Sequence, residues 1–253
     1  MKQIPNFFTL LNLAFGCIAI ILILQPGENI TATQNGILII NLPEKITYAC
    51  FFIFAAGIVD FLDGFVARLM KATSEMGKQL DSLSDVVTFG VAPAMIMYQL
   101  LRMSYLKEES ALGTSVLLLL PAILIACCAA FRLAKFNIDE RQTTSFRGVP
   151  TPITGFVVAA LPLIIWYNQG NLAEIILNRW VLYFIIMIIS YLMISDIPIM
   201  SLKFKDYSFK NNQSKVLLAL ISLLLIVFFQ WAAIPLIYIV FVGLSLIFRK
   251  QIL

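Results

Sequence analysis

Long apolar runs recur along the chain, and short polar stretches separate them. A helix needs about 20 predominantly apolar residues to cross the hydrocarbon core of a bilayer, and most of these runs approach that length. The runs lie at residues 6–24, 47–70, 79–101, 114–137, 152–167, 179–197, 215–229 and 232–248. The pattern predicts an all-α polytopic membrane protein with about eight transmembrane helices, forming one membrane domain over residues 1–253.

Two segments near the N-terminus need separate interpretation: the first apolar run and the polar segment that follows it. The first apolar run follows Lys2, as the apolar part of a signal peptide would, but the following LQPGENI lacks a small-x-small cleavage pattern. We therefore expect the run to be a retained helix. The segment at residues 25–46 contains the apolar piece GILIINL, which is too short to span and predicts a small element on the outer surface.

The composition agrees with a membrane protein and narrows the possible chemistry. Of the 253 residues 60% are hydrophobic and 13% charged, with a mean hydropathy of +0.92. The net charge of +4 comes without a basic stripe and interleaved aromatic residues, so no nucleic-acid partner is expected. The four cysteines lack metal-ligand spacing, and there is no histidine. Any metal site must therefore use oxygen ligands.

The distribution of positive charge predicts the orientation in the membrane. With eight spans, 14 of the 18 Lys and Arg residues fall on the side that carries the N-terminus. The positive-inside rule places that side in the cytoplasm. We expect an integral protein of the cell (inner) membrane with both termini, and the ends of the second and third spans, at the cytoplasmic face.

An acidic stretch interrupts the apolar pattern there. It reads VDFLDGFVARLMKATSEMGKQLDSLSDVV and occupies residues 59–87. At about 100° per residue, Asp60 and Asp63 share one helical face with Gly64 and Ala67. On the next helix Asp81 and Asp85 share a face with Ser74, Gly77 and Thr88. The connection is short, so the two helices should be antiparallel neighbours with converging carboxylates.

Four converging carboxylates need either protons or cations between them. Charged groups inside a membrane are costly and are functional candidates by default. Oxygen ligands without His or Cys suit Mg²⁺ or Mn²⁺, and two such ions about 3.5–4 Å apart are a known device for phosphoryl displacement. Gly64 and Gly77 would leave room for a ligand beside the carboxylates, although small residues also serve plain helix packing.

The spacing D-x2-D-G-x2-A-R-x8-G-x3-D-x3-D, complete from Asp60 to Asp85, resembles the signature of the CDP-alcohol phosphotransferase family. The resemblance implies a membrane enzyme that moves a phosphatidyl or related group from a CDP-linked donor to an alcohol and releases CMP. It also implies a homodimer, and a six-helix catalytic core over roughly residues 1–197. Residues 198–253 would then be a cytoplasmic loop and two extra helices.

The same resemblance implies roles for individual residues. Asp60, Asp63, Asp81 and Asp85 match the ligands of two Mg²⁺ or Mn²⁺ ions, and Asp85 also matches the general base. Residues implied to contact the CDP part of the donor are Asn6, Thr9, Gly64, Ala67, Arg68, Ser74 and Gly77. Each has a simpler reading, since Asn6 could cap a helix and Arg68 could be a surface charge that extends to water.

A second stretch bears on the acceptor alcohol. FRLAKFNIDERQTTSFRGVPTP, residues 131–152, resembles a segment of the membrane-embedded phosphatidylserine synthases within this family, with Lys135 and Val149 as conservative departures. The resemblance implies CDP-diacylglycerol and L-serine as substrates and phospholipid biosynthesis as the role. Arg132, Lys135 and Arg147 are candidates to bind serine. For Lys135 and Arg147, membrane topology or attraction to lipid headgroups is the simpler explanation.

Two alternatives stay open at this stage. The same chemistry could act on glycerol 3-phosphate, inositol or inositol phosphate, although a phosphorylated acceptor calls for a denser basic cluster. A cation transporter could use the carboxylates as an ion path, but it predicts acids spread across the membrane depth. Here the acids gather at one end of two helices. A purely structural membrane protein would not need four convergent carboxylates.

Overall fold

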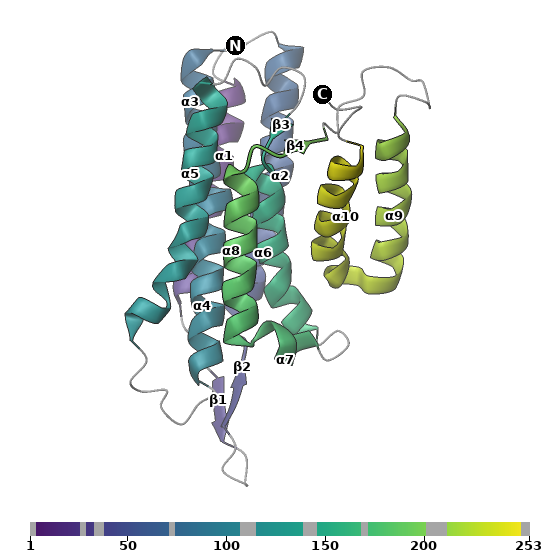
Figure 1. Ribbon diagram of the computed structural model, residues 1–253. Coiled ribbons are helices and arrows are strands. Elements are labelled where there is room, and N and C mark those ends of the chain that lie inside the picture. The colour runs from purple at the N-terminus through teal and green to yellow at the C-terminus, as the bar shows by residue number, and fades with distance from the viewer. Residues whose placement is uncertain are drawn as a thin grey trace.

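A helical bundle and a separate helical hairpin make up the structure, a computed structural model (Figure 1). It describes residues 4–25, 29–32, 38–70, 74–106, 115–138, 146–167, 172–200 and 212–248. Within these ranges, five helical segments are long and apolar enough to cross a membrane, and two shorter apolar helices accompany them. The prediction of an all-α polytopic membrane protein is confirmed.

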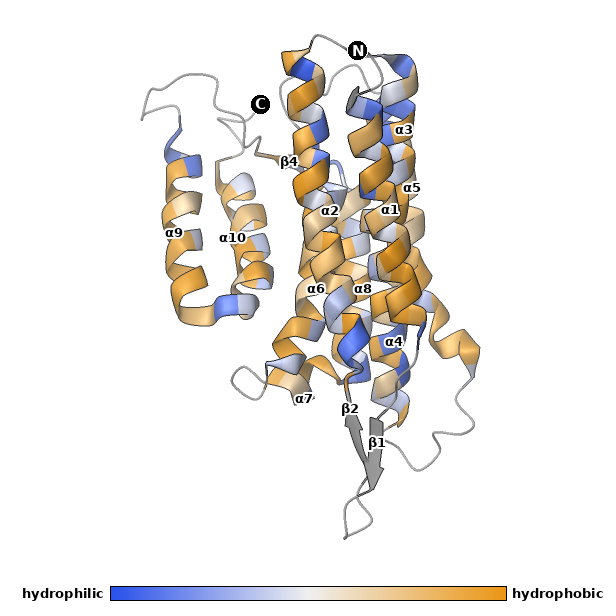
Figure 2. Cartoon of the chain, turned by 180° about the vertical axis from the view of Figure 1, so that it is seen from behind, coloured by the Kyte–Doolittle hydropathy of each residue, from blue (hydrophilic) through white to orange (hydrophobic). Residues whose placement is uncertain are grey.

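The first two long helices lie side by side. α1 (Ile4–Leu24) packs along α2 (Glu44–Leu69), and the middle of both helices is largely apolar (Figure 2). Between them, β1 (Asn29–Ala32) and β2 (Leu38–Asn41) form an antiparallel pair. This hairpin projects from the end of the molecule opposite α3 (Figure 1), where a small surface element was expected.

The third span contains a local change of helix type. α3 (Glu75–Asp85) continues through the π-helical turn η1 (Val86–Val91) into α4 (Ala92–Leu106), giving one helical segment of 32 residues. π-turns inside α-helices often occur at functional sites, and this one starts directly after Asp85. Its Thr88, Phe89 and Gly90 are buried, so the turn inserts small and apolar groups into the core.

The remaining bundle helices surround this central segment. The fourth span begins with 3₁₀ turns η3 (Val116–Leu118) and η4 (Leu120–Ala122) and continues as α5 (Ile123–Ile138). α6 (Thr151–Trp166), the short α7 (Leu172–Ile176) and α8 (Arg179–Ile194) follow. α6 and α8 have 16 residues each and are shorter than the long spans.

A short sheet connects the start of α6 to the end of α8. β3 (Phe146–Arg147) pairs antiparallel with β4 (Pro198–Ile199), and the Gly148 amide donates to the Ile197 carbonyl at 3.0 Å. Gly148 has φ +72°, and a Cβ there would lie 2.3 Å from the Met193 carbonyl oxygen. Only glycine fits this turn, because both the conformation and the close approach exclude a side chain.

The last two predicted spans form the separate hairpin. α9 (Gln213–Phe229) and α10 (Ala233–Ile247) are joined by the 3₁₀ turn η6 (Gln230–Ala232), where Gln230 has φ 47°. Trp231 in this turn stacks on Tyr167 at 6.2 Å and meets Phe51 edge-on at 5.8 Å. These aromatic contacts attach the hairpin to α2 and to the end of α6.

Candidate metal and substrate site

Two helices supply the carboxylates, as the spacing predicted. Asp60 and Asp63 project from α2, and Asp81 projects from α3; one carboxylate oxygen of each lies within 4.8 Å of the others. Asp60 also contacts Asp85, one turn after Asp81. The four carboxylates therefore converge at one end of the bundle, although α2 and α3 make few direct backbone contacts within the described residues.

α1 lies beneath the carboxylates and supplies a neutral donor to each of the two buried ones. The Thr9 hydroxyl donates to Asp63 Oδ2 at 2.8 Å, and Asn12 Nδ2 donates to Asp85 Oδ1 at 3.2 Å. Asp63 and Asp85 are only 7% and 6% exposed. One oxygen of each buried carboxylate thus accepts from α1, and the two donors, three residues apart, lie on one helical face.

Side chains of α3 and of the π-turn η1 in turn donate hydrogen bonds to backbone carbonyls of α1. Ser84 Oγ donates to the Thr9 carbonyl at 3.2 Å, and Thr88 Oγ1 donates to the Asn12 carbonyl at 3.2 Å. Gly16 allows this close approach, since a Cβ there would lie 2.3 Å from Thr88 Oγ1. The donors on α1 and the carboxylates on α3 are therefore held in one register.

A pocket of about 230 Å³ opens beside the carboxylates. Its lining residues come from α1, α2 and the first turns of α3: Pro5, Asn6, Thr9, Asp63, Gly64, Ala67, Ser74, Gly77, Lys78 and Asp81. A Cβ on Gly64 would meet no heavy atom within 4 Å, whereas one on Gly77 would approach Ser74 Oγ and Asn6 Oδ1. Gly64 therefore leaves open space, as the sequence suggested, and Gly77 keeps two polar atoms accessible.

Six of the seven residues predicted to contact the donor line this pocket. The exception is Arg68, which is exposed near the end of α2 and is not part of the described lining. Ser74 has a structural role as well, because its Oγ accepts from the Gly77 amide at 3.0 Å and caps α3. Its hydroxyl proton remains available for a ligand.

Arg132 is the predicted acceptor residue that is buried within the bundle. It is 7% exposed on α5, and its Nη1 donates to Thr151 Oγ1 at 3.1 Å. The negative charge of Asp85 acts on its guanidinium. Among the described residues, none accepts a hydrogen bond from its buried Nε. A buried guanidinium with an unpaired N–H is suited to an anionic ligand.

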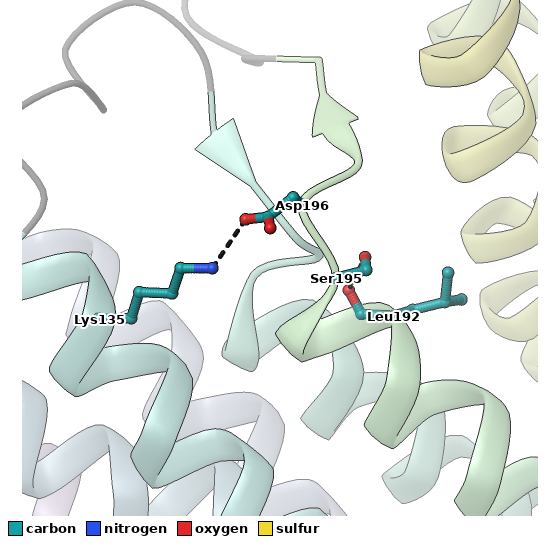
Figure 3. A network of polar contacts seen from close by, with 4 residues as sticks. All are labelled: Lys135, Leu192, Ser195 and Asp196. Carbon is teal, nitrogen blue, oxygen red and sulfur yellow. Dashed lines mark hydrogen bonds and ion pairs between the residues drawn. The ribbon is translucent and has the colours of Figure 1, made fainter.

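The other two predicted acceptor residues are arranged differently. Lys135 Nζ forms an ion pair with Asp196 Oδ1 at 2.7 Å, joining α5 to the segment that follows α8 (Figure 3). Arg147 lies in β3 opposite Pro198 and is partly exposed. Neither residue lines the described pocket.

Sequence reasoning missed two residues of the site. Asn12 is not part of the acidic motif, and its bond to Asp85 depends on how α1 crosses α3. Lys78 was counted only as a charge that sets topology, yet it lines the pocket and its Nζ donates to the Asn137 carbonyl at 3.1 Å. The spacing of Lys78 from Asp81, i to i+3 on one helix, could have indicated it.

The donor set fits a hard divalent cation. Three carboxylate oxygens within 4.8 Å could hold a metal ion, and all-oxygen coordination is the preference of Mg²⁺ and Mn²⁺. Asn12 Oδ1 adds a second sign of an incomplete polar site, because it is buried without a hydrogen-bond partner among the described residues.

Related proteins cover most of the chain. Residues 2–194 match the model of the CDP-alcohol phosphatidyltransferase family. A CDP-diacylglycerol–serine O-phosphatidyltransferase of Bacillus subtilis is 35% identical over 182 residues, covering 71% of this chain and 89% of the relative. One from Helicobacter pylori is 33% identical over 209 residues, covering 81% and 78%. An archaetidylserine synthase of Methanothermobacter thermautotrophicus is 28% identical over 196 residues, covering 77% and 68%.

Proposed function

The chain belongs to the CDP-alcohol phosphatidyltransferase family, and we propose that it transfers the phosphatidyl group of CDP-diacylglycerol to the hydroxyl of L-serine. The products would be phosphatidylserine and CMP. The proposal rests on the carboxylate cluster that lies beside a pocket. The choice of serine rests on the relatives, which are named as serine O-phosphatidyltransferases. The enzyme would act in phospholipid biosynthesis.

We assign the metal site to the four aspartates of the motif. Asp60, Asp63, Asp81 and Asp85 would hold two Mg²⁺ or Mn²⁺ ions. When bound, these ions would neutralise the diphosphate and stabilise the charge that develops on it. Thr9 and Asn12 support this assignment, because each bonds one oxygen of a carboxylate and so orients it toward the cluster.

The chain's own residues would position the reactants and move one proton. The serine hydroxyl oxygen forms a bond to the phosphorus that bears diacylglycerol, and the bond from that phosphorus to the CMP oxygen breaks. Asp85 accepts the hydroxyl proton. The donor would lie in the pocket against Asn6, Ser74 and Gly77, with Gly64 and Ala67 leaving room for its nucleotide part.

Serine would enter from the side of α5. Arg132 would bind its carboxylate, since the guanidinium is buried near Asp85 with an N–H to spare. This places the hydroxyl of serine beside the proposed base. Lys135 and Arg147 would contribute indirectly, by fixing the segments around the acceptor.

We further propose that the site faces the cytoplasm from the inner membrane and that the enzyme is a homodimer. α1 begins and α10 ends toward the same end of the molecule as α3 (Figure 1), and α3 carries Asp81 and Asp85. The excess of Lys and Arg on that side supports a cytoplasmic assignment. Accessibility of single cysteines introduced next to Gly77 and in the β1–β2 hairpin would test the orientation.

Acceptor-dependent CMP release tests the proposed function. Purified protein in liposomes would receive CDP-diacylglycerol and Mn²⁺ with serine, glycerol 3-phosphate, inositol or inositol phosphate. We expect release with serine only and none after EDTA. Release with another alcohol would keep the metal chemistry and overturn the serine assignment. No release with any acceptor, from folded protein, would favour the transporter.

A further inference from the structure

Lys78 is the one positively charged residue among the described residues that line the pocket. The other charged lining residues, Asp63 and Asp81, are acids. Lys78 occupies one of the undefined positions of the recognised motif, directly after Gly77. A pocket that receives an anionic phosphate group therefore presents a single cation, and the motif does not account for it.

The position of Lys78 on α3 places it between two other pocket residues. At about 100° per residue, it lies roughly 40° around the helix from Ser74 and roughly 60° from Asp81. It is four residues after the helix cap and three before the carboxylate, so all three share one side of the first turns. Its side chain is exposed and therefore accessible to a ligand.

A hydrogen-bond network holds the side chain at the edge of the pocket. Lys78 Nζ donates to the Asn137 carbonyl at 3.1 Å, near the end of α5. Asn137 Nδ2 donates to Ser82 Oγ at 2.8 Å, and Ser82 Oγ donates back to the Lys78 carbonyl at 3.2 Å. An ammonium has three donors, so two remain for a ligand after the bond to Asn137.

We propose that Lys78 binds the diphosphate of the CDP-linked donor. This inference rests on the proposed function, which supplies the donor's chemistry. Lysine is a common phosphate ligand, and Arg68, the cation of the motif, is exposed outside the described lining. The tether to α5 would also join the donor pocket to the segment that carries Arg132.

The test separates a donor contact from a structural connection between α3 and α5. The variants are Lys78→Gln and Lys78→Arg, with Lys45→Gln as the matched control. Lys45 is an exposed lysine at the opposite end of the bundle that donates to Gln25 Oε1. Each variant would be measured for KM of CDP-diacylglycerol, KM of serine, thermal stability and affinity for CDP in the presence of Mn²⁺.

We expect Lys78→Gln to raise the KM for CDP-diacylglycerol and the Kd for CDP by roughly 10- to 100-fold, the range for losing a hydrogen bond to a charged group. The KM for serine and the melting temperature should stay near wild type, and Lys78→Arg should restore most of the CDP affinity. The Lys45→Gln control should behave as wild type.

Three results would overturn the proposal: an unchanged CDP affinity in Lys78→Gln, a rise confined to the KM for serine, or a lower melting temperature with unchanged kinetics. CDP binding needs no turnover. If wild-type protein releases no CMP with serine, the proposed function fails, while the comparison of CDP affinities still decides the role of Lys78.

Discussion

The donor side of the site and its acceptor side are built in different ways. On the donor side, α2 and α3 each present their aspartates on one helical face, and two donors on α1 bond Asp63 and Asp85. On the acceptor side, Arg132 and Lys135 lie one turn apart on α5 but have different partners: Thr151 for Arg132 and Asp196 for Lys135. Helical spacing thus groups the aspartates within each helix of the donor side, whereas the acceptor-side residues are related to their partners by tertiary contacts only.

The largest expected effect tests the shared centre of the two sides. Asp85→Asn should lower kcat by about 10³-fold or more, because a general base contributes 10²–10⁴-fold and a proposed metal ligand is lost with it. Serine-dependent CMP release measures this effect. A variant within tenfold of wild type would remove Asp85 from the role of base.

Replacing Arg132 tests whether this residue binds the acceptor, serine, and not the donor. Arg132→Gln should raise the KM for serine by roughly 10- to 100-fold through loss of a charge-assisted hydrogen bond, with the KM for CDP-diacylglycerol near wild type. Arg132→Lys should restore only part of the affinity, since lysine lacks the planar fork of donors. An effect on the donor's KM alone would place Arg132 on the other side of the site.

Replacing Asn12 tests whether its hydrogen bond to Asp85 contributes to the reaction rate. Asn12→Ala removes the donor to Asp85 Oδ1 and should reduce kcat by about tenfold, with smaller changes in either KM. Asn12→Gln keeps the amide and should recover part of the rate. If both variants lose only thermal stability, the bond is structural.

The smallest effect is expected at the ion pair between α5 and the end of α8. Lys135 and Asp196 have side chains 35% and 65% exposed, and exposed pairs contribute about 0–1 kcal/mol. Lys135→Gln and Asp196→Asn should therefore each change the KM for serine by less than about fivefold. A loss in Lys135→Gln as large as in Arg132→Gln would show that Lys135 binds serine directly.

Much of the fold was predictable because an apolar run long enough to cross a membrane rarely forms anything other than a helix. Within the described residues, each of the eight predicted runs overlaps a helical segment. The π-turn after Asp85 was not predictable from periodicity; within it Gly90 lies so close to Ala129 that a Cβ would approach to 2.9 Å. The last two helices were expected as an addition to a six-helix core, but the contacts of Trp231 with Phe51 and Tyr167 that attach them had no local signal in the sequence.

The site shows the same division. Asp60, Asp63 and Asp81 could be grouped from spacing on two helices, and Gly64 from its place beside them. The contacts of Thr9 and Asn12 required the crossing of α1 over α3, and the partner of Lys135 required a segment 61 residues further along the chain. Residues whose role is set by a distant partner carry no local signal in the sequence.

The central claim is that the hydroxyl oxygen of serine attacks the phosphorus of CDP-diacylglycerol. The most direct test follows that oxygen. Wild-type protein would be incubated with CDP-diacylglycerol, Mn²⁺ and serine labelled with ¹⁸O in its hydroxyl, and the lipid product analysed by mass spectrometry. The account predicts phosphatidylserine that retains the label and CMP that carries none, because the serine oxygen attacks phosphorus. Unlabelled phosphatidylserine, or no serine-containing lipid from folded protein, would contradict it.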